Sequence, residues 1–259
     1  MAGQQDYLPS FKQGFARSAA ESEFPQLWRG LLGAWVPALG RCGNVLRDAS
    51  GRGRTAVAAG GSVSWTPSPV GPAADLSNNC FSAAFPVPQG KIGIAATVYH
   101  KTIVTTSSLL GDKSGSNPRL NVSLPNNGTV YWEYGDTSFN GRLTAPMPGD
   151  ALNRWRSWVF NADASANRME ILYGGALLRG GSCAAAAIPD GITLGLFGST
   201  YWNSGIAAIL IYNRPIDRLA ARALAADPLA PFRLSRRAWG SALRRSDGAY
   251  RRLLASTYG

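Results

Sequence analysis

Residues 191–227, GITLGLFGSTYWNSGIAAILIYNRPIDRLAARALAAD, contain the clearest fold signal in the chain. Ile192, Leu194 and Leu196 alternate with small residues, which predicts a strand with one buried face. After a turn-rich segment, residues 206–212 form an almost continuous apolar run. Such a run predicts a strand buried on both faces.

The end of this stretch predicts a short helix. Pro215 ends the preceding strand because it has no N–H for the ladder. Asp217 suits the N-cap position, and Leu219 and Leu224 fall on one face of the helix that would follow. Pro228 stops that helix, so we expect two final strands and a closing helix.

Bulk composition agrees with a sheet protein. The chain has 259 residues with 30 Gly, 16 Pro and 8 Trp, and only 16% of its residues are charged. Many turn residues and few charges are more typical of short strands joined by tight turns than of a helical bundle. The length is sufficient to bury a substantial core, and we expect one all-β domain with extensions.

Other stretches also predict strands. In residues 91–105, Ile92, Ile94, Ala96 and Val98 alternate on one face, which predicts a long central strand. Apolar segments on both sides of Asn127-Gly128 predict a hairpin, because Asn-Gly is a strong signal for a two-residue turn.

Several motifs occur in the order found in laminin G-like (concanavalin A-like) jelly rolls. The sequence resembles this family, especially its members in bacterial and phage proteins. The matching segments are the opening GLLGAW at 30–35, the turn DASGRG at 48–53, Trp155, Trp158, Tyr173 and Gly175, and the ending GIAAILIYNRPID at 205–217. The resemblance implies a two-sheet antiparallel jelly-roll sandwich over residues 27–228, flanked by arms at 1–26 and 229–259.

The two arms are predicted partner-binding segments. Residues 10–22 have helical character, with Phe11 and Phe15 spaced to cover either a partner or the parent domain. The chain has a net charge of +11, and its C-terminal arm is rich in arginine. A basic arm can bind an acidic protein surface, nucleic acid or anionic lipid. The predicted partner-binding residues are Phe11, Phe15, Arg233, Arg236, Arg237, Arg244, Arg245, Arg251 and Arg252.

Catalytic chemistry is not expected. His100, the one histidine, lies in a predicted strand without a nucleophile motif, so it is interpreted as a structural residue. Glu133 and Asp136 are three residues apart, which places them on opposite faces of a strand. Glycoside hydrolysis needs two carboxyl groups on the same side of the substrate, so we expect no enzyme activity.

Metal and disulfide signals are weak. Asp48, Asp75, Asp112 and Asp136 lie in turns without the spacing of a calcium loop, so turn capping is the expected role of these residues. No metal or other cofactor is predicted. The three cysteines, Cys42, Cys80 and Cys183, are expected to be free thiols. A disulfide between Cys42 and Cys80 is the alternative.

Aromatic residues in turns, which we expect to be exposed, are the candidate ligand-binding residues. Aromatic rings suit the C–H face of a pyranose, and side-chain amides can bind its hydroxyl groups. Tyr131 near the hairpin is one such residue. Burial under a partner subunit would explain the aromatic residues in these turns equally well. The predicted glycan-binding residues are Tyr201, Trp202, Asn203, Trp132 and Tyr134.

Three functional hypotheses follow, and the first two depend partly on the family resemblance. The first 15 residues lack a signal-peptide core and no segment is apolar enough for a membrane span, so we expect production in a host cytoplasm. The leading hypothesis is a non-enzymatic phage virion protein, either a capsid decoration or a tail-associated adhesion subunit. Its partners would be other virion proteins and further copies of this chain. The alternative is a lectin-like carbohydrate-binding module, and nucleic-acid binding by the arginine-rich arm is a weaker third.

Overall fold

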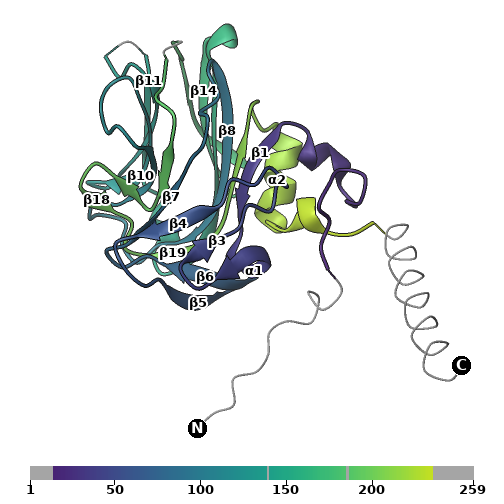
Figure 1. Ribbon diagram of the computed structural model, residues 1–259. Coiled ribbons are helices and arrows are strands. Elements are labelled where there is room, and N and C mark those ends of the chain that lie inside the picture. Colours follow the sequence, from purple (N-terminus) through teal and green to yellow (C-terminus); the bar gives the residue numbers. More distant parts are fainter. Residues whose placement is uncertain (1–13, 139, 185–186, 236–259) are drawn as a thin grey trace, which may run out of the picture. The chain divides into compact units, whose positions relative to one another are not determined.

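The computed structural model describes residues 14–138, 140–184 and 187–235. These residues fall into two compact units, one within residues 30–228 and the other formed by residues 14–29 together with 229–235. The first unit is a sandwich of two antiparallel sheets that face one another, with β8 and β14 in one sheet and β10 and β11 in the other (Figure 1). The predicted all-β jelly-roll fold is confirmed.

One sheet has eight strands within the described residues. Its order is β15 (Ala176–Gly181), β14 (Arg168–Tyr173), β13 (Trp155–Asp163), β8 (Lys91–Tyr99), β19 (Gly205–Tyr212), β6 (Gly71–Asp75) and β5 (Ser64–Ser68), and β1 (Leu31–Trp35) also pairs with β19. Every residue of β19 is buried, as the apolar run predicts. β19 and β8 are central strands of this sheet.

The other sheet has nine described strands. Its order is β12 (Arg142–Pro146), β11 (Thr129–Gly135), β10 (Arg119–Asn126), β9 (Ser108–Asp112), β16 (Ile192–Leu194), β7 (Cys80–Ala83), β4 (Ala56–Ala59), β3 (Val45–Leu46) and β2 (Arg41–Cys42). A separate hairpin joins β17 (Leu196–Phe197) and β18 (Thr200–Tyr201). The predicted Asn127-Gly128 turn joins β10 and β11, and both turn residues have positive φ, 48° and 75°.

The core lies between the sheets. Ile92, Ile94, Ala96 and Val98 of β8 are all buried in it, which confirms the predicted alternation. β8 is shorter than predicted and ends at Tyr99. The hydroxyl of Thr102 accepts hydrogen bonds from the backbone N–H groups of Val104 and Thr105, which turns the chain away from the sheet. His100 therefore follows the strand instead of lying in it.

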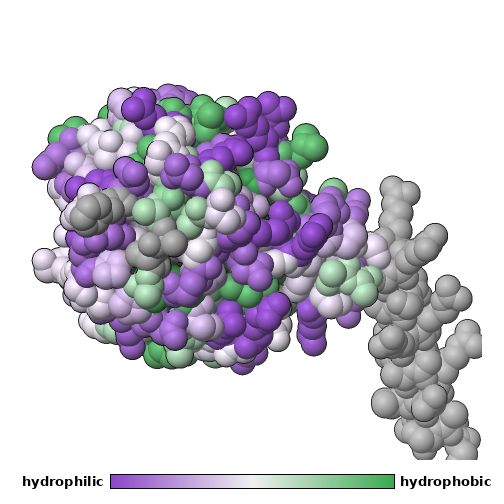
Figure 2. All heavy atoms as spheres, turned by 90° about the horizontal axis from the view of Figure 1, so that it is seen from above, coloured by the Kyte–Doolittle hydropathy of each residue, from purple (hydrophilic) through white to green (hydrophobic). Residues whose placement is uncertain are grey.

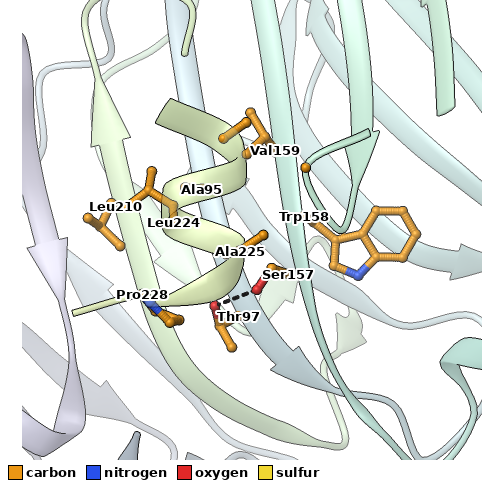
Figure 3. Close-up of a pocket in the computed structure, with 12 residues that line it drawn as sticks. Ala95, Thr97, Ser157, Trp158, Val159, Leu210, Leu224, Ala225 and Pro228 are labelled. Carbon is orange, nitrogen blue, oxygen red and sulfur yellow. Dashed lines mark hydrogen bonds between the residues drawn. The ribbon is translucent and has the colours of Figure 1, made fainter. Parts of the chain in front are cut away.

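The closing helix, α2 (Arg218–Ala226), packs against the eight-stranded sheet (Figure 3). Asp217 caps it as predicted, accepting a hydrogen bond from Ala220 N at 2.8 Å. Leu224 points toward Leu210 of β19, and the gap left beside them is about 10 Å³, too small for an organic ligand. The contact between α2 and the sheet therefore stabilises the fold and has no room for a ligand.

Short helices occupy a few connections. They are the α-helix α1 (Pro37–Gly40) and the 3-10 helices Pro25–Trp28, Gly149–Ala151, Ala164–Ala166 and Ala230–Phe232. No helix of the described residues combines the length and apolarity needed to cross a membrane. On the face seen in Figure 2, apolar residues are scattered among hydrophilic ones.

In the second unit, segments from both chain ends bind each other. Ser22 and Leu234 form an antiparallel bridge, and Ala16 N donates to Phe232 O at 2.8 Å. The predicted helix over residues 10–22 is absent from its described part, 14–22, where backbone groups bond to the C-terminal segment. Phe15 contacts Phe232 edge to face. Arg233 is also described, whereas Phe11, Arg236, Arg237, Arg244, Arg245, Arg251 and Arg252 lie outside the described residues.

Candidate functional site

Polar side chains cover the outer face of the nine-stranded sheet. Trp132 and Tyr134 of β11 point into the core, so Tyr131 and Glu133 point outward. Strand pairing extends this face in two rows across neighbouring strands. One row contains Arg142, Glu133, Asn121, Gly111 and Thr193, and the other contains Thr144, Tyr131, Ser123 and Ser108. These two rows, together with Arg119 on β10, are called the polar face below.

Glu133 lies at the centre of the polar face and is 1% exposed. Its Oε1 accepts hydrogen bonds from Arg119 Nη2 at 2.7 Å and Arg142 Nε at 2.6 Å. Its Oε2 accepts one from Asn121 Nδ2 at 2.7 Å. Both oxygens of this buried carboxylate are therefore held by charged or amide donors.

The surroundings of Glu133 keep it ionised. Burial by itself raises the pKa of the carboxyl group. Hydrogen bonds from Arg119 and Asn121, together with the positive charges of Arg119 and Arg142, more than offset this effect, so the pKa is lowered. One negative charge thus faces two positive charges, and the cluster has an excess positive charge.

Aromatic rings lie beneath both guanidinium groups. Arg142 Cζ is 5.3 Å from the ring centre of Tyr131, and Arg119 Cζ is 5.4 Å from that of Phe197. Phe197 and Tyr201, which belong to the β17–β18 hairpin, are half-buried, as is Tyr131. Cation–π contact of this kind fixes the orientation of an arginine side chain.

Gly111 allows the hairpin to lie on the polar face. A Cβ atom at Gly111 would be 2.4 Å from Cδ2 of Phe197, closer than van der Waals contact permits. Thr193 Oγ1 also donates a hydrogen bond to Leu196 O at 2.6 Å, which holds the hairpin beside the sheet. The hairpin therefore forms one wall of the polar face.

The polar face contains two unpaired buried atoms. Among the described residues, Asn121 Oδ1 and Arg119 Nε are buried and have no hydrogen-bond partner. The other such atoms are His100 Nδ1, Arg156 Nε, Trp202 Nε1 and Tyr212 OH, which lie elsewhere. An unpaired buried polar group costs about 1–3 kcal/mol, and because both atoms are shielded from solvent, a partner for either would have to be as small as a water molecule.

The predicted glycan-binding aromatics are mostly core residues. Trp132, Tyr134 and Trp202 are each at most 1% exposed, so the expectation that they are exposed is wrong. Alternation along β11 turns Trp132 and Tyr134 inward, where Trp132 Nε1 donates to Asn161 O at 2.9 Å and Tyr134 OH to Pro88 O at 2.6 Å. Trp202 packs edge-on against His100, at 5.6 Å between ring centres.

Tyr201 and Asn203, the other two predicted glycan-binding residues, are not buried in the core. Tyr201 is half-buried on the hairpin that borders the polar face. Asn203 is exposed, but its Oδ1 accepts a hydrogen bond from Asn78 N at 2.9 Å. This bond joins the loop of Asn203 to the loop of Asn78. Sequence analysis did not identify Arg119, Asn121, Arg142 or Phe197. Applying strand alternation to both arms of the predicted hairpin would have placed Asn121 beside Glu133.

Acidic and histidine side chains outside the polar face have structural partners. Asp136 lies beyond the end of β11 and accepts hydrogen bonds from Asn117 Nδ2 at 2.7 Å and Ser138 N at 2.8 Å. His100 Nε2 accepts one from Trp158 Nε1 at 2.9 Å. Glu133 is the only acidic residue in the two rows of the polar face, so these rows offer no second carboxylate to work with it.

The turn aspartates bind backbone groups. Asp48 accepts hydrogen bonds from the N–H groups of Ala34, Ser50 and Arg54, at 2.9, 2.9 and 3.1 Å. Asp112 similarly accepts one from Leu120 N at 2.7 Å. No cluster of three or more potential metal-binding side chains occurs among the described residues. The three cysteines are free, with Cys42 exposed and the other two buried.

Several solved structures share this fold. Domain 4 of AbnA, a GH43 extracellular arabinanase from Geobacillus stearothermophilus in complex with arabinotriose, matches with a TM-score of 0.60 at 15% identity, over 75% of this chain and 98% of that domain. The binding domain of botulinum neurotoxin DC in complex with SialylT matches with a TM-score of 0.61 at 12% identity, over 78% of this chain and 52% of its own.

A third similar structure is a Trypanosoma rangeli sialidase in complex with a difluorinated nononic acid. It has a TM-score of 0.53 at 18% identity, over 76% of this chain but only 32% of the sialidase. No family model matches the sequence, and no curated protein matches it. The similar structures show that this chain has a jelly-roll sandwich fold.

Proposed function

We propose that this protein is a carbohydrate-binding module whose ligand lies on the polar face. The observation that carries the proposal is the guanidinium group of Arg142, whose side chain is 39% exposed and lies over the half-buried ring of Tyr131 at 5.3 Å. A sugar can offer a hydroxyl oxygen to the N–H donors of this group. Its C–H face can pack on the tyrosine ring.

The exposed part of the polar face lies on β12. Hydroxyl groups from three strands follow one another along its second row, in Thr144, Ser123 and Ser108. The hairpin with Phe197 and Tyr201 borders the row at the β9 end. Thr144 is exposed, whereas Ser123 and Ser108 are buried and hydrogen-bonded to each other at 3.2 Å, so a sugar would meet the face at Arg142, Thr144 and Tyr131.

Binding without cleavage is part of the proposal. A glycosidase needs one carboxylic acid that donates a proton and a second carboxylate that acts as base or nucleophile. Glu133 is held ionised, and both of its oxygens already accept hydrogen bonds. It is therefore suited to holding Arg119 and Arg142 in place and poorly suited to protonating a leaving group.

The similar structures support a role in sugar binding. The arabinanase domain holds arabinotriose and the toxin domain holds SialylT, so this sandwich fold can present sugars on more than one protein. Because the identities are 15% and 12%, these likenesses do not indicate which surface of this chain would bind a sugar. The choice of surface depends on the contacts of this chain.

Isothermal titration against a panel of oligosaccharides tests the proposal. Tyr131→Ala should weaken binding about tenfold, which corresponds to about 1.4 kcal/mol. The matched control is Trp65→Ala, because Trp65 is also half-buried and has Arg41 over its ring at 5.5 Å but lies on the eight-stranded sheet. The proposal fails if no oligosaccharide binds, or if both variants bind like the unaltered protein.

The virion role remains a second candidate from the sequence. The similar structures are parts of an arabinanase, a neurotoxin and a sialidase, so they do not test assembly on a particle. The specific observation in its favour is that segments from both chain ends form one compact unit, in which Phe15 and Trp28 contact Phe232. A carbohydrate-binding module anchored to a virion through its chain ends would reconcile both functions. Deleting residues 236–259 should then lower its occupancy on particles.

A further inference from the structure

We infer that the glycan bound on the polar face carries an anionic group, a carboxylate or a sulfate ester, that pairs with Arg142 and Arg119. The inference builds on the proposed function and specifies its substrate class. It depends on the charge balance of the polar face and on the hydrogen-bonding groups of the two arginines that Glu133 leaves free.

The positive charges of the polar face outnumber its negative charges. Glu133 supplies one negative charge to two guanidinium groups, both of which bond to the same oxygen, Oε1. The other residues of the two rows are neutral. A partly dehydrated site with one excess positive charge favours an anionic ligand over a neutral one.

The arginines have donors to spare. A guanidinium group has five N–H donors. The side chain of Arg119 is 22% exposed, and only its Nη2 binds Glu133. The side chain of Arg142 is 39% exposed while its Nε and Nη2 bind Glu133, so a ligand can reach the group from solvent. Two oxygens of one carboxylate or sulfate group can accept two parallel hydrogen bonds from a guanidinium group.

The arginines are also held in position before the ligand arrives. Arg142 packs over Tyr131, Arg119 packs over Phe197, and each is tied to Glu133. Fixing these long side chains in the free protein lowers the entropy cost of binding. Glu133 thus serves as a positioning residue for the two arginines.

The test must separate this site from unspecific attraction by a chain of net charge +11. Short ligands are therefore used in pairs that differ in charge: trigalacturonate and its methyl ester, sialyllactose and lactose, and sulfated lactose and lactose. Titrations at 150 mM salt screen long-range attraction. The protein variants are Arg142→Gln, Arg142→Lys and, as control, Arg179→Gln, because Arg179 is an exposed arginine of β15 on the other sheet.

We expect the charged member of at least one pair to bind about tenfold more tightly than its neutral partner, as for a hydrogen bond to a charged group. Arg142→Gln should abolish that preference, Arg142→Lys should keep part of it, and Arg179→Gln should leave it unchanged. The carboxylate and sulfate pairs show which anionic group is recognised.

Equal binding within all three pairs, or a preference that survives Arg142→Gln, overturns the inference. If neutral sugars bind and lose affinity in Tyr131→Ala while no pair shows a charge preference, carbohydrate binding stands and only the anionic class fails. If nothing binds, both fail.

Discussion

Lowering the pH from 7 to 5 should destabilise the sandwich through His100. The imidazole is 1% exposed, its Nε2 accepts a hydrogen bond from Trp158 Nε1 at 2.9 Å, and its ring lies against Trp158 and Trp202. Protonation would destroy the acceptor and place a charge in an apolar site. Burial, assisted by the positive charge of Arg156, lowers the pKa of His100 from 6.5 to about 4.

The sign of the effect follows from proton uptake. Between pH 6.5 and 4 the unfolded chain binds a proton at His100 that the folded chain does not, so stability falls as the pH falls. A shift of this size lowers the free energy of unfolding by about 2 kcal/mol at pH 5, and by about 3.4 kcal/mol below both pKa values. The pKa values of Glu133, Asp136 and Asp163 are lowered from the ordinary values of 4.5 and 3.8, so the stability linked to these carboxyl groups is lost mainly below those values. The loss of stability between pH 7 and pH 5 therefore reports mainly on His100.

Urea unfolding at pH 7 and pH 5 measures this difference. The unaltered protein should lose about 2 kcal/mol between the two pH values, whereas His100→Gln should lose little, because glutamine does not titrate. Lys101→Gln is the matched control at the neighbouring, exposed position and should keep the full pH dependence. An equal loss in His100→Gln and the unaltered protein would refute the reasoning.

Two further predictions concern residues that shape the fold around the polar face. Gly111→Ala should destabilise the protein by about 1–3 kcal/mol and weaken sugar binding, because the added Cβ meets Phe197 at 2.4 Å. Thermal unfolding checks it against Gly180→Ala, where the nearest atom is 3.8 Å from the added Cβ; equal melting temperatures would contradict it. Asp217→Ala should cost about 1 kcal/mol through loss of the α2 cap without changing sugar affinity, and unaltered stability would show that the 2.8 Å bond to Ala220 N contributes nothing.

Local signals in the sequence were sufficient for several central elements of the fold. The apolar run of β19, the alternating isoleucines of β8 and the Asn127-Gly128 turn each depend on neighbouring residues only. The cap of α2 by Asp217 is local as well. Strand period, turn geometry and helix capping are set within a few residues, so a single sequence contains them.

The polar face depends on contacts between distant segments. Arg119, Glu133 and Arg142 meet because β10, β11 and β12 pair in one register, and Phe197 joins them from a hairpin about 60 residues later in the chain. Register and burial are long-range properties, so no local pattern marks these residues as partners. For the same reason Trp202 resembled an exposed loop aromatic until its contact with His100 was seen.

The sequence by itself therefore determined an all-β domain, its central strands and its closing helix, because periodicity and turn chemistry are local, whereas the two-sheet sandwich was implied by the family resemblance. Only the tertiary structure decided which aromatics are core and which side chains surround Glu133. Those outcomes depend on which face of each strand turns toward the other sheet, and packing of the whole sandwich fixes that choice.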